Sequence, residues 1–226
     1  MTLAVTAPPK AAAQINEGVC RRLRVLHDSA AEVFRLIPPS NTRANRKTIR
    51  QATLSLHAFL INAVGIMDNM AWAYVYWHAL DNGLQRTNVD LFKSTLQARL
   101  PQEWVDFLTS SDLVAWQNSY LKPYRDALAH RIPPYIPESY PPAETVEINR
   151  LRSLMSEAAK AQDWDAALAL QDEVDQQLGH AFSFLHTQDA PVEPLILHPQ
   201  MLADLATIEE ALRLFLRVVQ TSPRTP

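Results

Sequence analysis

The sequence predicts an all-α protein, a helical bundle of about five to seven helices with a proline-rich connector. Apolar residues recur at the three-to-four-residue spacing of helices along most of the chain. Strand signals are nearly absent, and only four glycines occur among 226 residues. The balance of 47% hydrophobic and 20% charged residues is that of a globular protein, so the helices have enough apolar surface to build a core.

Two long helices are expected in the first part of the chain. The first runs from about Gln14 to Leu36 and ends before Pro38, since proline cannot continue the helical hydrogen-bond ladder. The second runs from about Arg46 to Leu80 and is apolar over most of its circumference from Phe59 onward. This second helix is therefore expected to be the central helix of the bundle.

Shorter helices should follow. One is expected from Asn88 to Leu100, and Pro101 begins another turn. A third begins at Ser110 or Ser111, whose hydroxyl can cap it. It then meets Pro123, which either kinks the helix or begins a new one.

The remainder of the chain is expected to be helical around two irregular stretches. Ile132 to Pro142 holds five prolines and is an extended connector. From Glu144 to Gln177 the pattern indicates a helical hairpin with Asp163 as a cap. A second irregular stretch, Thr187 to Pro199, precedes a final amphipathic helix from about Gln200 to Val219. The apolar face of that helix consists of Leu202, Leu205, Ile208, Leu212, Phe215 and Leu216.

We divide the chain into two parts on this pattern. Residues 1–142 form a bundle, with its core at about 14–131, plus the connector. Residues 143–226 form the hairpin and the final helix, which packs on the bundle. The core is expected from Phe59–Trp77, Leu113–Leu128 and Leu202–Leu216.

Composition excludes several classes of function. The glycines lie too far apart to build a phosphate-cradling loop, which excludes P-loop and dinucleotide-binding proteins. Cys20 is the only cysteine, so one chain holds neither a disulfide nor a thiolate metal site. The seven histidines show none of the spacings of helical zinc or di-iron sites. We therefore predict no metal and no other cofactor.

The expected location is the cytoplasm, because the N-terminus lacks the basic-then-apolar pattern of a secretion signal. The most apolar stretch, Ala58 to Leu80, contains the polar residues Asn62, Asp68, Asn69 and His78. Their polar groups would be costly in hydrocarbon, so we expect a buried helix there and no membrane partner.

Charge is unevenly distributed. Residues 21–50 carry eight basic and two acidic side chains, a net +6, although the whole chain is −3. A basic segment of this kind suits phosphates or an acidic partner, and a solvated helix face is the alternative.

The segment from Tyr124 to Arg131 combines a cation, a carboxylate and an imidazole within about two helical turns. Asp126 and His130 are four residues apart, so the carboxylate can orient the ring and favour its protonated form. Arg125 lies about 140° from His130 around an ideal helix, but its long side chain can reach the same opening. A proton-transferring imidazole and a phosphate-binding guanidinium are the groups that metal-free RNA cleavage requires.

The pattern Arg125-Asp126-x-x-x-His130 resembles the Arg-polar-x-x-x-His signature of the HEPN superfamily. Its members are compact helical bundles, and many resemble toxin or defence ribonucleases that act as dimers with a shared cleft. The resemblance implies His130 as acid/base, Arg125 as phosphate ligand and Asp126 as supporting polar group. It also implies a homodimer as the active form and attack of a ribose 2′-hydroxyl on the adjacent phosphate.

An upstream segment extends this resemblance. Residues 66–72 are similar to an Asp-Asn-x-Ala segment of bacterial HEPN-like proteins, with Asp68 and Asn69 as a buried polar pair that supports the site. Arg131 and Tyr124 flank the motif as further supporting residues, and Tyr124 either stacks on a base or packs on the bundle. The resemblance covers roughly residues 50–135 and leaves residues 144 onward outside it.

Two functions stay open. One is a metal-independent endoribonuclease of a toxin or defence system, whose partners would be a second copy of the chain, RNA and a protein antitoxin. The other is a non-catalytic helical module that binds another protein. In that case Asp68 neutralises Arg125 inside the bundle and His130 caps a helix end. The net charge of −3 favours the second function, because most of the surface would repel RNA.

Overall fold

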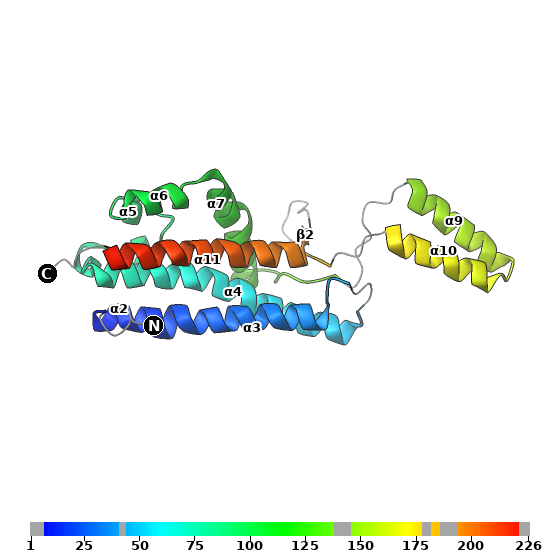
Figure 1. Cartoon of the computed structure of the whole chain (residues 1–226), viewed down its shortest axis with the longest axis horizontal. Helices are drawn as coiled ribbons and strands as arrows, with labels where there is room; N and C mark the ends of the chain where they lie inside the picture. Colours follow the sequence, from blue (N-terminus) through cyan, green and yellow to red (C-terminus); the bar gives the residue numbers. More distant parts are fainter. Residues whose placement is uncertain (1–6, 41–43, 138–145, 178–181, 186–193, 222–226) are drawn as a thin grey trace.

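The computed structural model describes residues 7–40, 44–137, 146–177, 182–185 and 194–221. It is 78% helical, which confirms the all-α class, and its described residues form eight helices when continuous segments are taken together. The strands β1 (Ser183–Phe184) and β2 (Leu195–Ile196) pair antiparallel as a two-stranded sheet. Figure 1 shows the long helices lying side by side along the bundle.

The first long helix is continuous through three segments, α2 (Pro9–Ala13), η1 (Gln14–Cys20) and α3 (Arg21–Leu36). It begins five residues before the expected start, since Pro9 occupies the first turn, where its missing N–H is not needed. The segment η1 is a π-helix, a widening by one residue that no spacing in the sequence indicated. The end at Leu36 is as expected.

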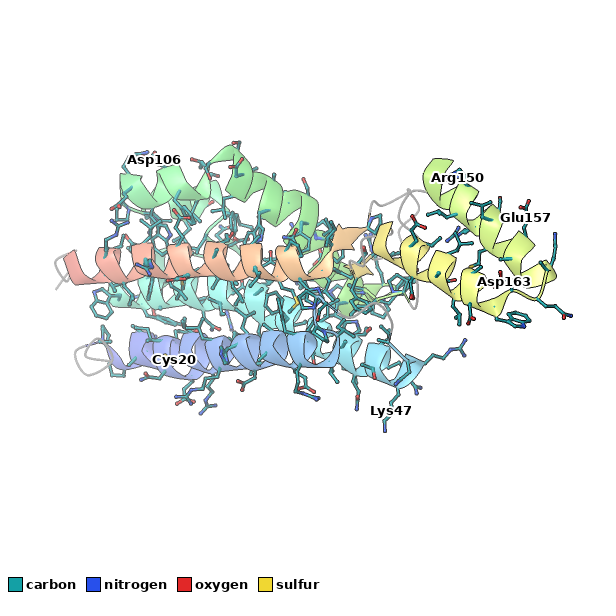
Figure 2. All side chains as sticks on the ribbon, turned by 45° about the vertical axis from the view of Figure 1, so that its right-hand side comes forward. Cys20, Lys47, Asp106, Arg150, Glu157 and Asp163 are labelled. Carbon is teal, nitrogen blue, oxygen red and sulfur yellow. The ribbon has the colours of Figure 1, made fainter. Side chains whose placement is uncertain are left out.

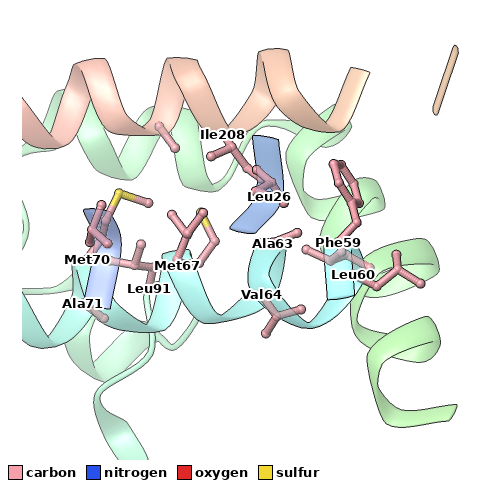
Figure 3. Packing of buried hydrophobic residues seen from close by; sticks show 14 of the residues in the cluster. Leu26, Phe59, Leu60, Ala63, Val64, Met67, Met70, Ala71, Leu91 and Ile208 are labelled. Carbon is pink, nitrogen blue, oxygen red and sulfur yellow. The ribbon is translucent and has the colours of Figure 1, made fainter. Parts of the chain in front are cut away.

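Helix α4 (Arg46–Trp77) is the centre of the bundle, as expected, and it contacts α3, α8 and α11. The Asn45 side chain caps it by accepting a hydrogen bond from the Thr48 N–H at 2.9 Å. Figure 3 shows Ala63 and Met67 of α4 beneath Ile208 of α11. By length and composition alone α4 could cross a membrane, but 67% of its most apolar window is buried inside the protein.

The expected helix from Asn88 to Leu100 is wrong in extent. Only α5 (Ser94–Gln97) is α-helical there, after two 3-10 turns, η2 (Asp81–Gly83) and η3 (Arg86–Asn88). The reason lies at Asp90, whose carboxylate accepts a hydrogen bond from the Phe92 N–H at 2.9 Å and so turns the chain locally. Helix α6 (Gln102–Leu108) follows Pro101 as expected.

The next helix is continuous through α7 (Ser111–Ala115), η4 (Trp116–Leu121) and α8 (Lys122–His130). Pro123 falls in the first turn of α8, directly after the π-helix η4, so the helix continues past it. Ser110 occupies the N-cap position, but its hydroxyl donates to the Phe107 carbonyl and does not cap the helix.

The connector after α8 is extended where the structure describes it. His57 of α4 lies with its Nε2 2.5 Å from the Pro134 carbonyl oxygen, and Tyr135 forms a β-bridge with Leu185. Ile136 is buried in the core. Residues 138–142, the remainder of the expected connector and the site of Tyr140, lie outside the described residues.

The helical hairpin is present as α9 (Val146–Lys160) and α10 (Trp164–Gln177). Its cap is confirmed, since the Asp163 carboxylate accepts from the Ala166 N–H at 3.1 Å. Leu151 and Val174 form a small hydrophobic cluster separate from that of the bundle. Figures 1 and 2 show the hairpin standing apart from the long helices.

The final helix, α11 (Leu197–Thr221), packs on α4 and α6, and the expected face is confirmed at Ile208 and Phe215. Leu205 and Leu212 of that face are partly buried against the core. Leu202 and Leu216 are 56% and 40% exposed, which contradicts their place in the predicted core. The buried face contains Met201, Asp204, Ile208, Ala211, Phe215 and Val218. Asp204 lies on the buried face, and its charge made the neighbouring face with Leu202 and Leu216 appear the more apolar one in the sequence.

Candidate functional site

Helix α8 places the motif residues around its circumference. Tyr124 and Ala127 are buried, Arg125 and Asp126 are half-buried, and His130 is exposed. Five residues along a regular helix correspond to about 140°, so Arg125 and His130 point in different directions from the same helix. The helix continues to His130 without fraying, so one chain alone does not turn both groups toward one point.

Asp126 pairs with Arg125 and not with His130. Its carboxylate oxygen lies 3.3 Å from the Arg125 Nε, and each side chain is 36% exposed. That Nε is buried and makes no well-aligned hydrogen bond within the described residues. The expected contact, in which the Asp126 carboxylate would accept a hydrogen bond from the His130 ring, is absent among the contacts of the described chain. The carboxylate therefore offsets the charge of the arginine and does not orient the imidazole.

His130 and Arg131 lie at the C-terminal end of α8 and are both exposed. The Arg131 N–H donates to the Ala127 carbonyl at 2.9 Å, after which the chain becomes extended. His130 is thus open to solvent.

Tyr124 is only 2% exposed and belongs to the core. Its ring packs edge-to-face against Tyr120 at 5.1 Å and Phe184 at 5.2 Å between ring centroids. Burial raises its pKa to about 12. Of the two roles that the sequence left open for Tyr124, the structure therefore supports packing on the bundle and not stacking on a base.

Asp68 departs from the expected buried pair, because the residue is exposed. Partial burial of its carboxyl group still raises its pKa, and the charge of Asp90 adds to the rise. The guanidinium groups of Arg125 and Arg22 lower that pKa, so both lie within electrostatic range. Asp68 forms no ion pair with Arg125 among the described contacts. The non-catalytic alternative, in which Asp68 neutralises Arg125 inside the bundle, therefore lacks its expected buried pair.

Asn69 belongs to a different cluster, on the side of α4 that faces the first helix. Its Oδ1 accepts from the Arg22 Nε at 2.9 Å, and its Nδ2 donates to the Gln14 Oε1 at 2.7 Å. Arg22 also donates through Nη1 to the Asn62 Oδ1 at 3.1 Å. Sequence reasoning missed Arg22, although Asn62, Gly65 and Asn69 share one helix face at spacings of three and four residues.

A second polar cluster missed in the sequence surrounds Asp204, which is fully buried. Its carboxylate accepts hydrogen bonds from Trp116 Nε1 at 2.8 Å, Tyr120 OH at 2.7 Å and Gln200 Nε2 at 2.8 Å. Burial raises its pKa to about 6, while the three donors act in the opposite direction. Only the tertiary structure reveals this cluster, because Trp116 and Tyr120 are more than 80 residues away in the chain.

No family model, no curated protein and no solved structure matches this chain. The resemblance to the HEPN superfamily therefore depends on the motif residues alone.

Proposed function

We propose that this protein is a HEPN-like, metal-independent endoribonuclease in which Arg125 binds the phosphate and His130 transfers the proton. The supporting observation is that His130 is exposed at the end of α8 and Arg125 keeps part of its side chain in solvent. Neither residue is occupied by a role in the hydrophobic core. Polar groups that the fold does not use are the ones available for chemistry.

The reaction needs two proton transfers. The 2′-oxygen of a ribose attacks the neighbouring phosphorus, and a neutral His130 takes the hydroxyl proton. The bond from phosphorus to the 5′-oxygen breaks, and a protonated imidazole gives that oxygen a proton. Arg125 stabilises the charge on the phosphate oxygens. Because Arg125 and His130 diverge by about 140° on α8, two subunits would supply the two imidazoles and the arginine facing them.

The test is cleavage of a single-stranded RNA oligonucleotide in the presence of a metal chelator. The unmodified protein should leave 2′,3′-cyclic phosphate ends, and the same oligonucleotide made of DNA should stay intact because it lacks the attacking hydroxyl. His130→Ala and Arg125→Ala should each lower the rate by at least about 100-fold. His27→Ala is the matched control, since His27 is also exposed beside an aspartate. Equal cleavage by His130→Ala and the unmodified protein would refute the proposal.

A second candidate function is a non-catalytic module that binds another protein through the hairpin. The observation that favours it is exposed apolar surface on α10, where Trp164 and Leu168 are 63% and 65% exposed and four residues apart. Expression of variants in a bacterial host separates the two functions. If expression arrests growth, the ribonuclease loses the effect with His130→Ala, and the binding module loses it with Leu168→Asp.

A further inference from the structure

The structure contains a half-buried arginine that no carboxylate pairs with directly. Arg22 lies in the groove between the first helix and α4, and both of its hydrogen-bond acceptors, Asn62 and Asn69, are neutral amides. Among the described residues, no acidic group forms an ion pair with it, and Asp68 acts on it only at longer range. A partly desolvated cation normally has an anionic partner, so this arrangement is unusual.

Two glycines make room for this arrangement. A Cβ added at Gly65 would lie 2.4 Å from the Arg22 Cζ, and one added at Gly18 would lie 2.5 Å from the Asn69 Cγ. The guanidinium therefore rests against the backbone of α4, and the Asn69 amide rests against the π-helix η1. Short π-helical segments are often found at functional sites. The position of the guanidinium is fixed from several sides.

The groove beside Arg22 is open and has a volume of about 390 Å³. Gln14, Glu17 and Arg21 are among the residues that line it. Glu17 and Arg21 form an ion pair with each other, so the net charge of the lining is the single positive charge of Arg22. An arginine has five N–H donors, and Arg22 uses two of them within the described chain. The other three donors have no hydrogen-bond partner among the described residues.

We propose that this groove binds the oxyanion of a small ligand, a phosphate or a carboxylate, on the free edge of the Arg22 guanidinium. A planar guanidinium held in place can donate two parallel hydrogen bonds to such a group, and holding it beforehand reduces the entropy lost on binding. This site lies between the first helix and α4, and no residue of the α8 motif lines it. Its existence does not depend on ribonuclease activity.

The amide signals of the glycines can report whether an anion binds in the groove. The chain has only four, and their amide signals in a ¹H–¹⁵N spectrum can be assigned individually. In titrations of the full chain with inorganic phosphate and with acetate, at constant ionic strength, the Gly18 signal should shift and saturate. Gly83, far from the groove in the sequence and absent from its lining, should stay in place. Saturation with phosphate alone assigns a phosphate ligand, and saturation with acetate assigns a carboxylate.

Three variants distinguish a bound anion from non-specific attraction. Arg22→Gln should abolish the saturable shift, whereas Arg24→Gln, which removes an exposed charge two residues away, should keep it. Gly65→Ala keeps every charge and favours the helix, but its methyl group displaces the guanidinium, so binding should weaken at least about tenfold. If Gly18 shows no saturable shift with either anion, or shifts equally in Arg22→Gln, the site does not exist.

Discussion

At the scale of single residues, Asp204 shows how one acid makes the stability of the bundle depend on pH. Its carboxyl group titrates near pH 6 in the folded chain, because burial raises its pKa from the ordinary value of 3.8. Between these values the folded chain binds more protons than the unfolded chain. The free energy of unfolding therefore falls as pH rises through this window. The contribution of Asp204 is fully present below about pH 4 and is lost above about pH 6.

We predict that Asp204→Asn removes this dependence, because an amide can accept from Trp116 and bond to Tyr120 without titrating. The difference in unfolding free energy between the two proteins should change by about 2 kcal/mol from pH 4 to pH 7, measured by urea denaturation. Burial lowers the pKa of His78 and His198 and produces an opposite slope in both proteins, so the difference is the quantity to compare. Asp112→Asn, at an exposed site on α7, is the control. Parallel pH curves for the Asp204→Asn variant and the unmodified protein would contradict the assignment.

A second prediction separates the chemistry of the motif from its packing. His130→Ala and Arg125→Ala should each change the free energy of unfolding by less than about 1 kcal/mol, as substitutions of accessible side chains usually do. Tyr124→Ala, only one position before Arg125, should cost about 3–5 kcal/mol because its ring is buried. Urea denaturation measures all three. A loss in His130→Ala as large as in Tyr124→Ala would favour the structural interpretation of the motif.

The candidate site could be read only partly from the sequence. The spacing of Arg125, Asp126 and His130 correctly placed them on one helix, but spacing does not determine which neighbour a carboxylate chooses. Asp126 pairs with the adjacent Arg125, whose long side chain reaches it, and not with the ring four residues on. The role of Asn69 was hidden for another reason, because its partners on the first helix are about 50 residues away in the chain.

At the scale of secondary-structure elements, long and strongly periodic segments were predicted well. The end at Leu36 and the start of α4 at Arg46 follow from proline and from the capping residue Asn45. The π-helices η1 and η4 were not predictable, because each inserts one residue without changing the average spacing of apolar positions. The face of α11 was predicted correctly at Ile208 and Phe215, but Asp204 was missed because tertiary hydrogen bonds, not apolar spacing, allow it to be buried.

The hairpin is the element expected to open most easily. Within the described residues its hydrophobic cluster consists of Leu151 and Val174 with Leu170 packed against them, whereas α4 is buried along most of its length. In hydrogen exchange of the full chain, amides of α9 and α10 should exchange faster than those of α4. Asp163→Ala should raise exchange in α10 about fivefold, the effect of losing a cap that contributes about 1 kcal/mol, and leave α4 unchanged. Equal protection of the hairpin and α4 would mean that the two open as one unit.

At the scale of the whole molecule, the motif at the end of α8 is followed directly by the described part of the connector, residues 132–137. Helix α8 packs on α4 and buries Tyr124 and Ala127, and the connector follows directly after Arg131. The first four basic residues of the segment from Arg21 lie on the first helix, which packs on α4. The two candidate anion-binding groups, Arg22 and Arg125, therefore come from different helices that pack on α4. The positive charge of each lowers the pKa of Asp68 on α4.

The last prediction is that the protein is a homodimer whose interface includes the region from Tyr124 to Pro142. Tyr124 itself is buried within one chain, so the apolar surface available in the described part of this region comes from Ile132 and Tyr135, 59% and 40% exposed. Two copies meeting here would bring their α8 helices together, which the divergence of Arg125 and His130 requires for catalysis. Light scattering at micromolar concentration should give twice the 25.5 kDa of one chain.

Ile132→Asp should shift that mass to the monomer, because a charge at the centre of an apolar interface is left without a partner. Leu54→Asp, at a residue 67% exposed on α4, is the matched control and should leave the dimer intact. A monomer in the unmodified protein would remove the shared cleft on which the proposed cleavage depends. A dimer that dissociates with Leu54→Asp and not with Ile132→Asp would place the interface at Leu54 and contradict the predicted one.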